Sequence, residues 1–161
     1  NIYITRAPIL KNREELISYS SSLYADSPEL QEHLYKILKD RDNLADTYIK
    51  PFQALLLHGR SPKLTRSCFG YARLEPPIYE KGRIIRGAIV SLIPSGPASE
   101  VAAPVTSEVI GTLLEEPALL KALQSLNKES FTKQLEEILL RFYKSTVQTR
   151  LHLQPSGAEK V

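Results

Sequence analysis

Residues 87–93 read Gly-Ala-Ile-Val-Ser-Leu-Ile, an apolar run broken only by one serine. A strand with one face in water alternates apolar and polar side chains, whereas a strand covered on both faces is apolar almost throughout. The run is also far too short to cross a membrane. It therefore predicts a strand inside a sheet that carries helices on both faces.

Helical signals precede this strand. After a short strand expected over residues 1–7, Asn12 is a suitable N-cap for a first helix. A second helix has clearer start signals, because Ser27 can cap it and Pro28 suits its first position. Arg41 lies near the end of this helix, where the helix dipole favours a cation.

The middle of the chain changes to period-two and continuous apolar runs, with breaks that leave room for three strands. The second and third are expected over residues 68–74 and 84–93, joined by a turn at residues 75–78. The C-terminal third returns to helical spacing, including a short helix that begins at Pro117. This order predicts an α/β fold in which a central mixed sheet lies between helices. We place the domain at residues 1–146 and expect residues 147–161 to form a flexible tail.

Composition narrows the classes of function. The chain has 161 residues, 42% hydrophobic and 24% charged, which is typical of a soluble globular domain. Its net charge of +3 comes from basic residues scattered among acids, so we expect no nucleic-acid contact by this domain and no membrane insertion. A single cysteine, Cys68, indicates a reducing compartment, and we expect a cytoplasmic location. The three histidines lie far apart and no nucleotide loop is present, so no metal or other cofactor is expected.

The apolar run at residues 54–57 leads directly to His58 and then to Gly59-Arg60-Ser61, which we expect to form a loop. A neutral imidazole nitrogen can attack a phosphoryl group if nearby donors hold the phosphoryl oxygens. Arg60 and Ser61 supply a guanidinium and a hydroxyl for that purpose. The plainer alternative is a half-buried histidine beside a solvated loop, and the residues alone leave it open.

Three segments in order carry a resemblance to a known family. They are Arg-x-x-Leu-x-x-Thr-Tyr-Ile at residues 41–49, the strand with His-Gly at residues 54–59, and Ala-Arg-Leu-x-x-Pro-Ile at residues 72–78. The chain resembles the mannitol/fructose-type enzyme IIA domains of the bacterial sugar phosphotransferase system (PTS) over about residues 4 to 144. The resemblance implies that His58 accepts a phosphoryl group. It adds Arg41 and Thr47 to the phosphate-binding candidates, which a helix-end cation and a turn-forming hydroxyl would explain equally well.

Within that family the sequence around His58 looks most like the variant at the C-terminus of mannitol-operon-type transcription activators with duplicated PTS regulation domains. Leu57 stands where transport components usually have a proline, and residues 50–53 replace a common Gly-x-Gly run. Many relatives carry a second active-site histidine after the long strand, whereas residues 95–103 contain none. We expect this loss to slow onward transfer more than it prevents acceptance.

The resemblance implies a regulatory domain whose phosphorylation on His58 reports sugar uptake to a transcription activator or antiterminator. It implies a PTS phosphocarrier protein or a IIB-type domain as partner, together with the other domains of the full-length regulator. Two alternatives stay open. One is a phosphoryl-transfer component of a sugar permease, and the other is a non-catalytic interaction domain of the same fold. The sequence also leaves homodimer formation open.

Overall fold

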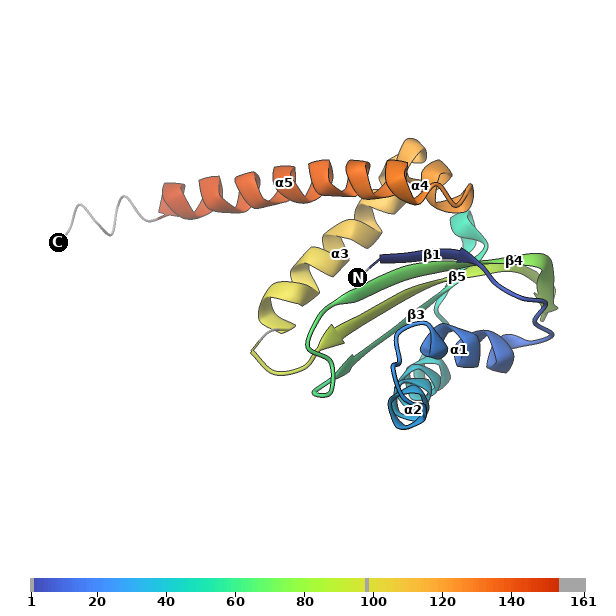
Figure 1. The fold of residues 1–161 in the computed structure, drawn as a ribbon. Helices are drawn as coiled ribbons and strands as arrows, with labels where there is room; N and C mark the ends of the chain where they lie inside the picture. The colour runs from blue at the N-terminus through green and yellow to red at the C-terminus, as the bar shows by residue number, and fades with distance from the viewer. Residues whose placement is uncertain (1, 98, 154–161) are drawn as a thin grey trace.

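The computed structural model describes residues 2–97 and 99–153. Within these residues the chain forms a five-stranded sheet, five α-helices and one short 3₁₀ helix (Figure 1). No helix in this part of the chain is long and apolar enough to cross a membrane. In chain order the elements are β1 (Ile2–Arg6), α1 (Arg13–Ser22), α2 (Pro28–Leu44), β2 (Tyr48–Ile49), η1 (Lys50–Phe52), β3 (Ala54–Ser61), β4 (Cys68–Glu80), β5 (Arg83–Pro94), α3 (Ser99–Glu115), α4 (Pro117–Gln124) and α5 (Lys128–Leu153).

The N-terminal helices begin where the sequence predicts. The Asn12 side chain accepts a hydrogen bond from the Glu15 backbone N–H at 2.9 Å, which caps α1. Ser27 Oγ accepts the N–H of Leu30 at 3.1 Å, and Pro28 opens α2. Both predicted N-caps are confirmed.

The sheet is mixed and has the strand order β1-β4-β5-β3-β2. β5 is its middle strand, antiparallel to β4 on one side and parallel to β3 on the other. Every residue from 87 to 93 is buried. The predicted central strand, covered on both faces, is therefore confirmed.

Helices cover the sheet from both sides (Figure 1). The face that carries α1 and α2 buries a cluster that includes Leu16, Leu38 and Leu55. The opposite face packs against α3, α4 and α5 through a second cluster that includes Ile89 and Phe131. Each of these side chains contributes about 1.5–3 kcal/mol by leaving water. The α/β sandwich expected from the sequence is the observed architecture.

The β4–β5 connection differs from the expectation. We predicted a turn at residues 75–78, but β4 continues to Glu80, and the turn consists of Lys81 and Gly82, both with positive φ (50° and 75°). The prolines of residues 75–78 lie where the β4–β5 register shifts, between Arg73 and Ile78. Proline is tolerated in a strand where the regular ladder of hydrogen bonds is interrupted.

The C-terminal helix continues beyond residue 146, where we placed the domain boundary. α5 runs to Leu153, and its C-terminal half extends past the sheet (Figure 1). Residues 147–153 are thus helical, while the remainder of the expected tail, residues 154–161, lies outside the described residues. The short helix expected from Pro117 is present as α4.

Candidate functional site

His58 does not lead into a loop. β3 continues through Ser61 because it pairs with β5 along its whole length, from Ala54 opposite Gly87 to Ser61 opposite Pro94. The expected loop at residues 59–61 is therefore wrong. Since side chains alternate along a strand, His58 belongs to one face of the sheet, and Ser61, three residues later, belongs to the other.

The face that carries His58 borders a cavity of about 530 Å³. β3 and β5 form one wall, α3 forms the second, and Arg41 reaches the cavity from the last turn of α2. Three of the five predicted site residues thus meet here, namely His58, Arg60 and Arg41. The full lining consists of Arg41, Leu56, His58, Gly59, Arg60, Ser91, Ile93, Ala103, Thr106, Ser107, Ile110, Gly111 and Leu114.

The environment of His58 favours its neutral form. The side chain is half-buried, and this burial lowers its pKa below the ordinary value of 6.5. The positive charge of Arg41 lowers the pKa further. A neutral imidazole at neutral pH keeps a lone pair on one ring nitrogen, which is the form that a nucleophile requires.

Hydroxyl groups in the cavity were missed by the sequence analysis. Ser91 on β5 lies directly across from His58 in the parallel register and is only 5% exposed. The signal that could have found it is its position as the lone hydroxyl in an apolar run. Thr106 and Ser107 also line the cavity, because α3 turns the face that contains them toward β3.

α3 starts at Ser99, so residues 99–103 of the segment without a second histidine are helical. Ala103 from this helix lines the cavity. In the described part of the lining, His58 and the two arginines Arg41 and Arg60 are the only ionisable side chains.

Ser61 lies away from the cavity. Its side chain is fully buried on the α2 face of β3, where Ser61 Oγ is 2.7 Å from His33 Nε2. The Ser61 hydroxyl also accepts the backbone N–H of Lys63 at 3.1 Å. His33 is half-buried at this contact.

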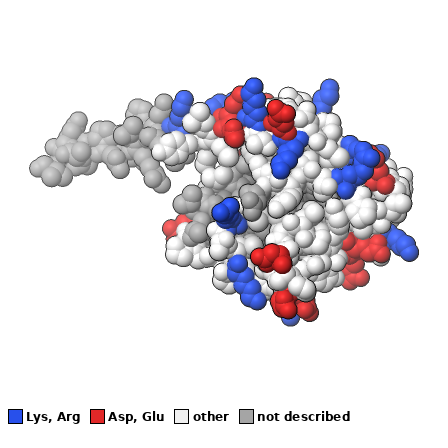
Figure 2. Space-filling view, viewed as in Figure 1, with Lys and Arg blue, Asp and Glu red and all other residues white. Residues whose placement is uncertain are grey.

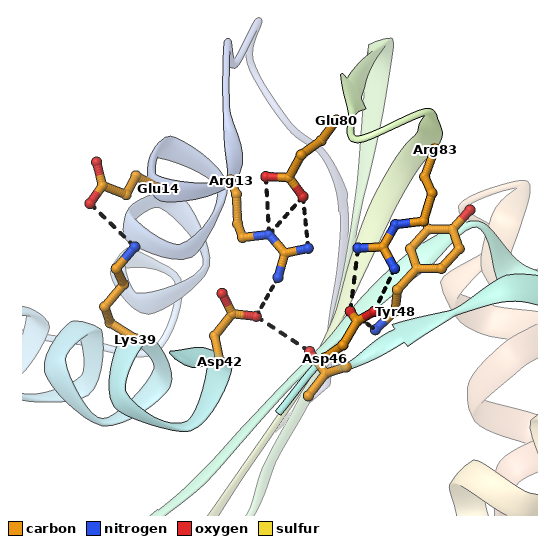
Figure 3. Close-up of polar contacts among 9 residues, drawn as sticks. Arg13, Glu14, Lys39, Asp42, Asp46, Tyr48, Glu80 and Arg83 are labelled. Atoms are coloured by element: carbon orange, nitrogen blue, oxygen red, sulfur yellow. Dashed lines mark hydrogen bonds and ion pairs between the residues drawn. The ribbon is translucent and has the colours of Figure 1, made fainter. Parts of the chain in front are cut away.

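Thr47 belongs to a charged network at the C-terminal end of α2, away from His33. Its hydroxyl lies 3.5 Å from Asp42 Oδ1, and Asp42 accepts a 2.8 Å hydrogen bond from Arg13. Arg13 also pairs with Glu80 at 2.7 Å, and Asp46 pairs with Arg83 nearby (Figure 3). The network joins α1 and the end of α2 to the β4–β5 hairpin, and Thr47 is not among the residues that line the cavity.

Charge elsewhere is dispersed. On the face shown in Figure 2, lysine and arginine side chains are interspersed with aspartate and glutamate. Among the described residues, no three His, Cys, Asp or Glu side chains are grouped in a way that could hold a metal ion.

Known proteins support the assignment of the fold and the family. The sequence matches the family described as phosphoenolpyruvate-dependent sugar phosphotransferase system, EIIA 2, over residues 1–138. Comparison with curated proteins returns no match. Among solved structures, the chain is similar to the nitrogen regulatory protein IIA-Ntr from Neisseria meningitidis, with a TM-score of 0.58 and 16% identity. That alignment covers 76% of this chain and 84% of the other, and it bears on the fold alone. Because the family match spans most of the sequence, the chain belongs to the PTS EIIA type 2 family.

Proposed function

We propose that His58 is the phosphoryl acceptor of this domain and that the domain is regulatory, passing information on sugar uptake to a transcription regulator. The observation that carries the proposal is the meeting of a half-buried His58, held toward its neutral form, with Arg41 and Arg60 in one cavity. Arg60 lies two residues from His58 on the same face of β3. Arg41 comes from a different element on the other side of the sheet edge.

The chemistry requires positioning and charge stabilisation. The lone pair of the His58 imidazole attacks the phosphorus of a phosphohistidine on a carrier protein, and the donor imidazole leaves as its N–P bond breaks. Charge spreads over three equatorial oxygens in the transition state. Arg41 and Arg60 can donate charged hydrogen bonds to these oxygens, and the hydroxyl of Ser91 can serve a third. Ser61 and Thr47 are left out of the proposed phosphate site because neither lines the cavity.

The regulatory role rests on what surrounds His58. Arginine holds an anion but does not act as an acid or base near neutral pH. The described cavity lining offers no carboxylate and no second imidazole to assist departure of the phosphoryl group. A phosphoryl group on His58 is then accepted readily and lost slowly, which suits a signal more than a transport relay.

Phosphorylation of His58 would act as a signal through the negative charge that it adds. Phosphorylation adds about −1.5 to −2 charges, which can bias a docking surface between two arrangements. The cavity opens between β3 and α3, so the added charge would lie beside two helices and the edge of the sheet. The proposed readers are a phosphocarrier or a IIB-type domain and the other domains of the regulator.

Phosphoryl labelling tests the proposal. Incubation with phosphoenolpyruvate and the general PTS carriers should give an acid-labile product, because N–P bonds hydrolyse in acid. The variant His58→Ala should lose the label, while the matched variant His152→Ala should label like the parent protein. If His58→Ala labels as well as the parent, His58 is not the acceptor.

A further inference from the structure

One stripe of α2 follows β3 on the face opposite the cavity. His33, Ile37 and Arg41 are spaced four residues apart, so they lie along one side of the helix. His33 contacts Ser61 at the end of β3, and Ile37 Cγ2 fills the space that a Cβ at Gly59 would occupy. Arg41, one turn further, reaches the cavity that contains His58. The same stripe thus both packs against β3 and delivers a proposed phosphate ligand.

Hydrogen bonds other than the one to His33 hold Ser61 in place. Its hydroxyl accepts the N–H of Lys63, and its carbonyl accepts the N–H groups of Leu64 at 3.3 Å and Ser95 at 3.1 Å. The residue is therefore fixed by the strand, by the turn after β3 and by the segment after β5. The 2.7 Å contact with His33 Nε2 then connects α2 to a residue whose position is fixed by hydrogen bonds outside α2.

The two contacts between α2 and β3 constrain different movements. The Ile37–Gly59 contact is apolar and non-directional, so it sets the distance between helix and strand but allows the helix to slide. The His33–Ser61 hydrogen bond is directional and joins a side chain of α2 to a side chain of β3. A slip of one residue would move α2 by about 1.5 Å along its axis.

The far end of α2 is held differently. The side chain of Asp42 is only 3% exposed and binds Arg13 of α1, which in turn pairs with Glu80 (Figure 3). This network attaches the helix end to α1 and to the β4–β5 hairpin, whereas the His33 contact attaches the helix to the strand that carries His58 itself.

We propose that the His33–Ser61 hydrogen bond fixes the register of α2 along β3 and thereby positions Arg41 beside His58. His33 and Ser61 are then positioning residues that act through Arg41. The phosphate role of the cavity comes from the function proposed above, but the positioning itself is a property of the unphosphorylated protein and is tested there.

NMR titration of the His58 imidazole in the unphosphorylated full chain tests the positioning. Because the charge of Arg41 lowers the pKa of His58, displacement of Arg41 should raise that pKa. We expect His33→Ala to raise it and His33→Gln to leave it near that of the parent, since the glutamine amide can still donate to Ser61 Oγ. Both variants remove the same imidazole, so their difference reports the hydrogen bond and not a lost charge.

Two further variants separate positioning from general loosening of the helix. Leu38→Val removes one methylene from the buried face of α2 and should destabilise the fold without moving the His58 titration. In an Arg41→Gln background, His33→Ala should produce no further change. An unchanged titration in His33→Ala, an equal change in Leu38→Val, or a full effect on top of Arg41→Gln would each overturn the proposal. Should His33→Ala fail to fold, Ser61→Ala removes the other partner of the same bond and must give the same pattern.

Phosphoryl labelling then keeps the two proposals apart. If the positioning is correct, His33→Ala should slow acceptance at saturating carrier, on the order of threefold, and no more than Arg41→Ala does. If His58→Ala still labels, the proposed function fails while the titration results stand. If the titration is unaffected while His58→Ala loses its label, the positioning fails and the proposed function stands.

Discussion

The two faces of β3 have different surroundings, although the residues on them alternate along a single strand. On the α3 face, His58 and Arg60 border a cavity wide enough for a ligand. On the α2 face, Gly59 and Ser61 are buried, and their neighbours Ile37 and His33 fill the space against them. Residues 58–61, which form one polar motif in the sequence, therefore separate into a proposed binding half (His58 and Arg60, facing the cavity) and an anchoring half (Gly59 and Ser61, packed against α2).

The anchoring half should be most sensitive to added volume. A Cβ at Gly59 would collide with Ile37 Cγ2, so Gly59→Ala should lower the free energy of unfolding by about 1–3 kcal/mol. Ile37→Ala removes the colliding methyl, and in that background Gly59→Ala should cost little. Urea denaturation of the parent, the two single variants and the double variant gives the coupling. Additive costs would show that α2 does not pack closely against Gly59.

Substitutions in the proposed binding half should slow phosphoryl acceptance and leave the stability of the fold nearly unchanged. Arg60 lies on the same strand face as His58 and lines the same cavity, so in the proposed site its guanidinium would lie close to the phosphoryl oxygens. We expect Arg60→Ala to slow acceptance on the order of tenfold, the cost of one charged hydrogen bond. Arg41→Ala should slow it by about threefold, because Arg41 reaches the cavity from the last turn of α2 and not from the strand that carries His58. Initial labelling rates rank the two, and a larger effect at Arg41 would reverse the roles assigned to them.

Buried serines on the two faces offer a matched pair. Ser91 lies across from His58 in the cavity, and Ser20 is buried on α1, with no hydrogen-bond partner for its hydroxyl in the described part of the chain. Ser91→Ala should slow acceptance by about threefold, the value of one neutral hydrogen bond. Ser20→Ala should leave acceptance unchanged and keep or slightly raise stability, because it removes an unpaired buried hydroxyl. Equal labelling rates in the two variants would remove Ser91 from the proposed phosphate site.

The lowered pKa of His58 predicts the smallest effect, a pH dependence of stability. Because the folded state holds this pKa below its ordinary value, the unfolded chain binds more protons at intermediate pH. The free energy of unfolding should therefore fall as the pH drops below about 6.5 and level off below the folded-state pKa. Denaturation of the parent and His58→Gln between pH 8 and pH 5 isolates this contribution, since the variant should lack it. A parent that gains stability relative to His58→Gln on acidification would contradict the sign.

Much of the fold could be predicted because its signals are local. Asn12 and Ser27 cap helices through contacts only three residues away, and the burial of residues 87–93 follows from their composition. The hairpin was misplaced because prolines commonly mark turns. Here they lie at a shift of register instead, and Lys81-Gly82 makes the turn.

The site could be predicted only in part, since its members meet through long-range pairing. His58, Arg60 and Arg41 were identified from chemistry and family resemblance, and they share a cavity. The face of Ser61 depends on β3 continuing beside β5, which no local pattern reveals. Ser91 stands out in the sequence only as the lone hydroxyl of an apolar run, and its position across from His58 is defined by the register of the folded sheet.

Onward transfer from phosphorylated His58 is the most direct test of the central claim, a phosphoryl acceptor built to hold its group. The domain should be labelled with phosphoenolpyruvate and the general carriers, purified, and mixed with a IIB-type acceptor beside a transport-type EIIA domain that carries the second histidine. We expect the label to leave His58 much more slowly than it leaves the transport domain, because the described cavity lining supplies arginines and hydroxyls but no acid or base to assist departure. Transfer as fast as that of the transport domain would contradict the regulatory account and favour a role in sugar transport.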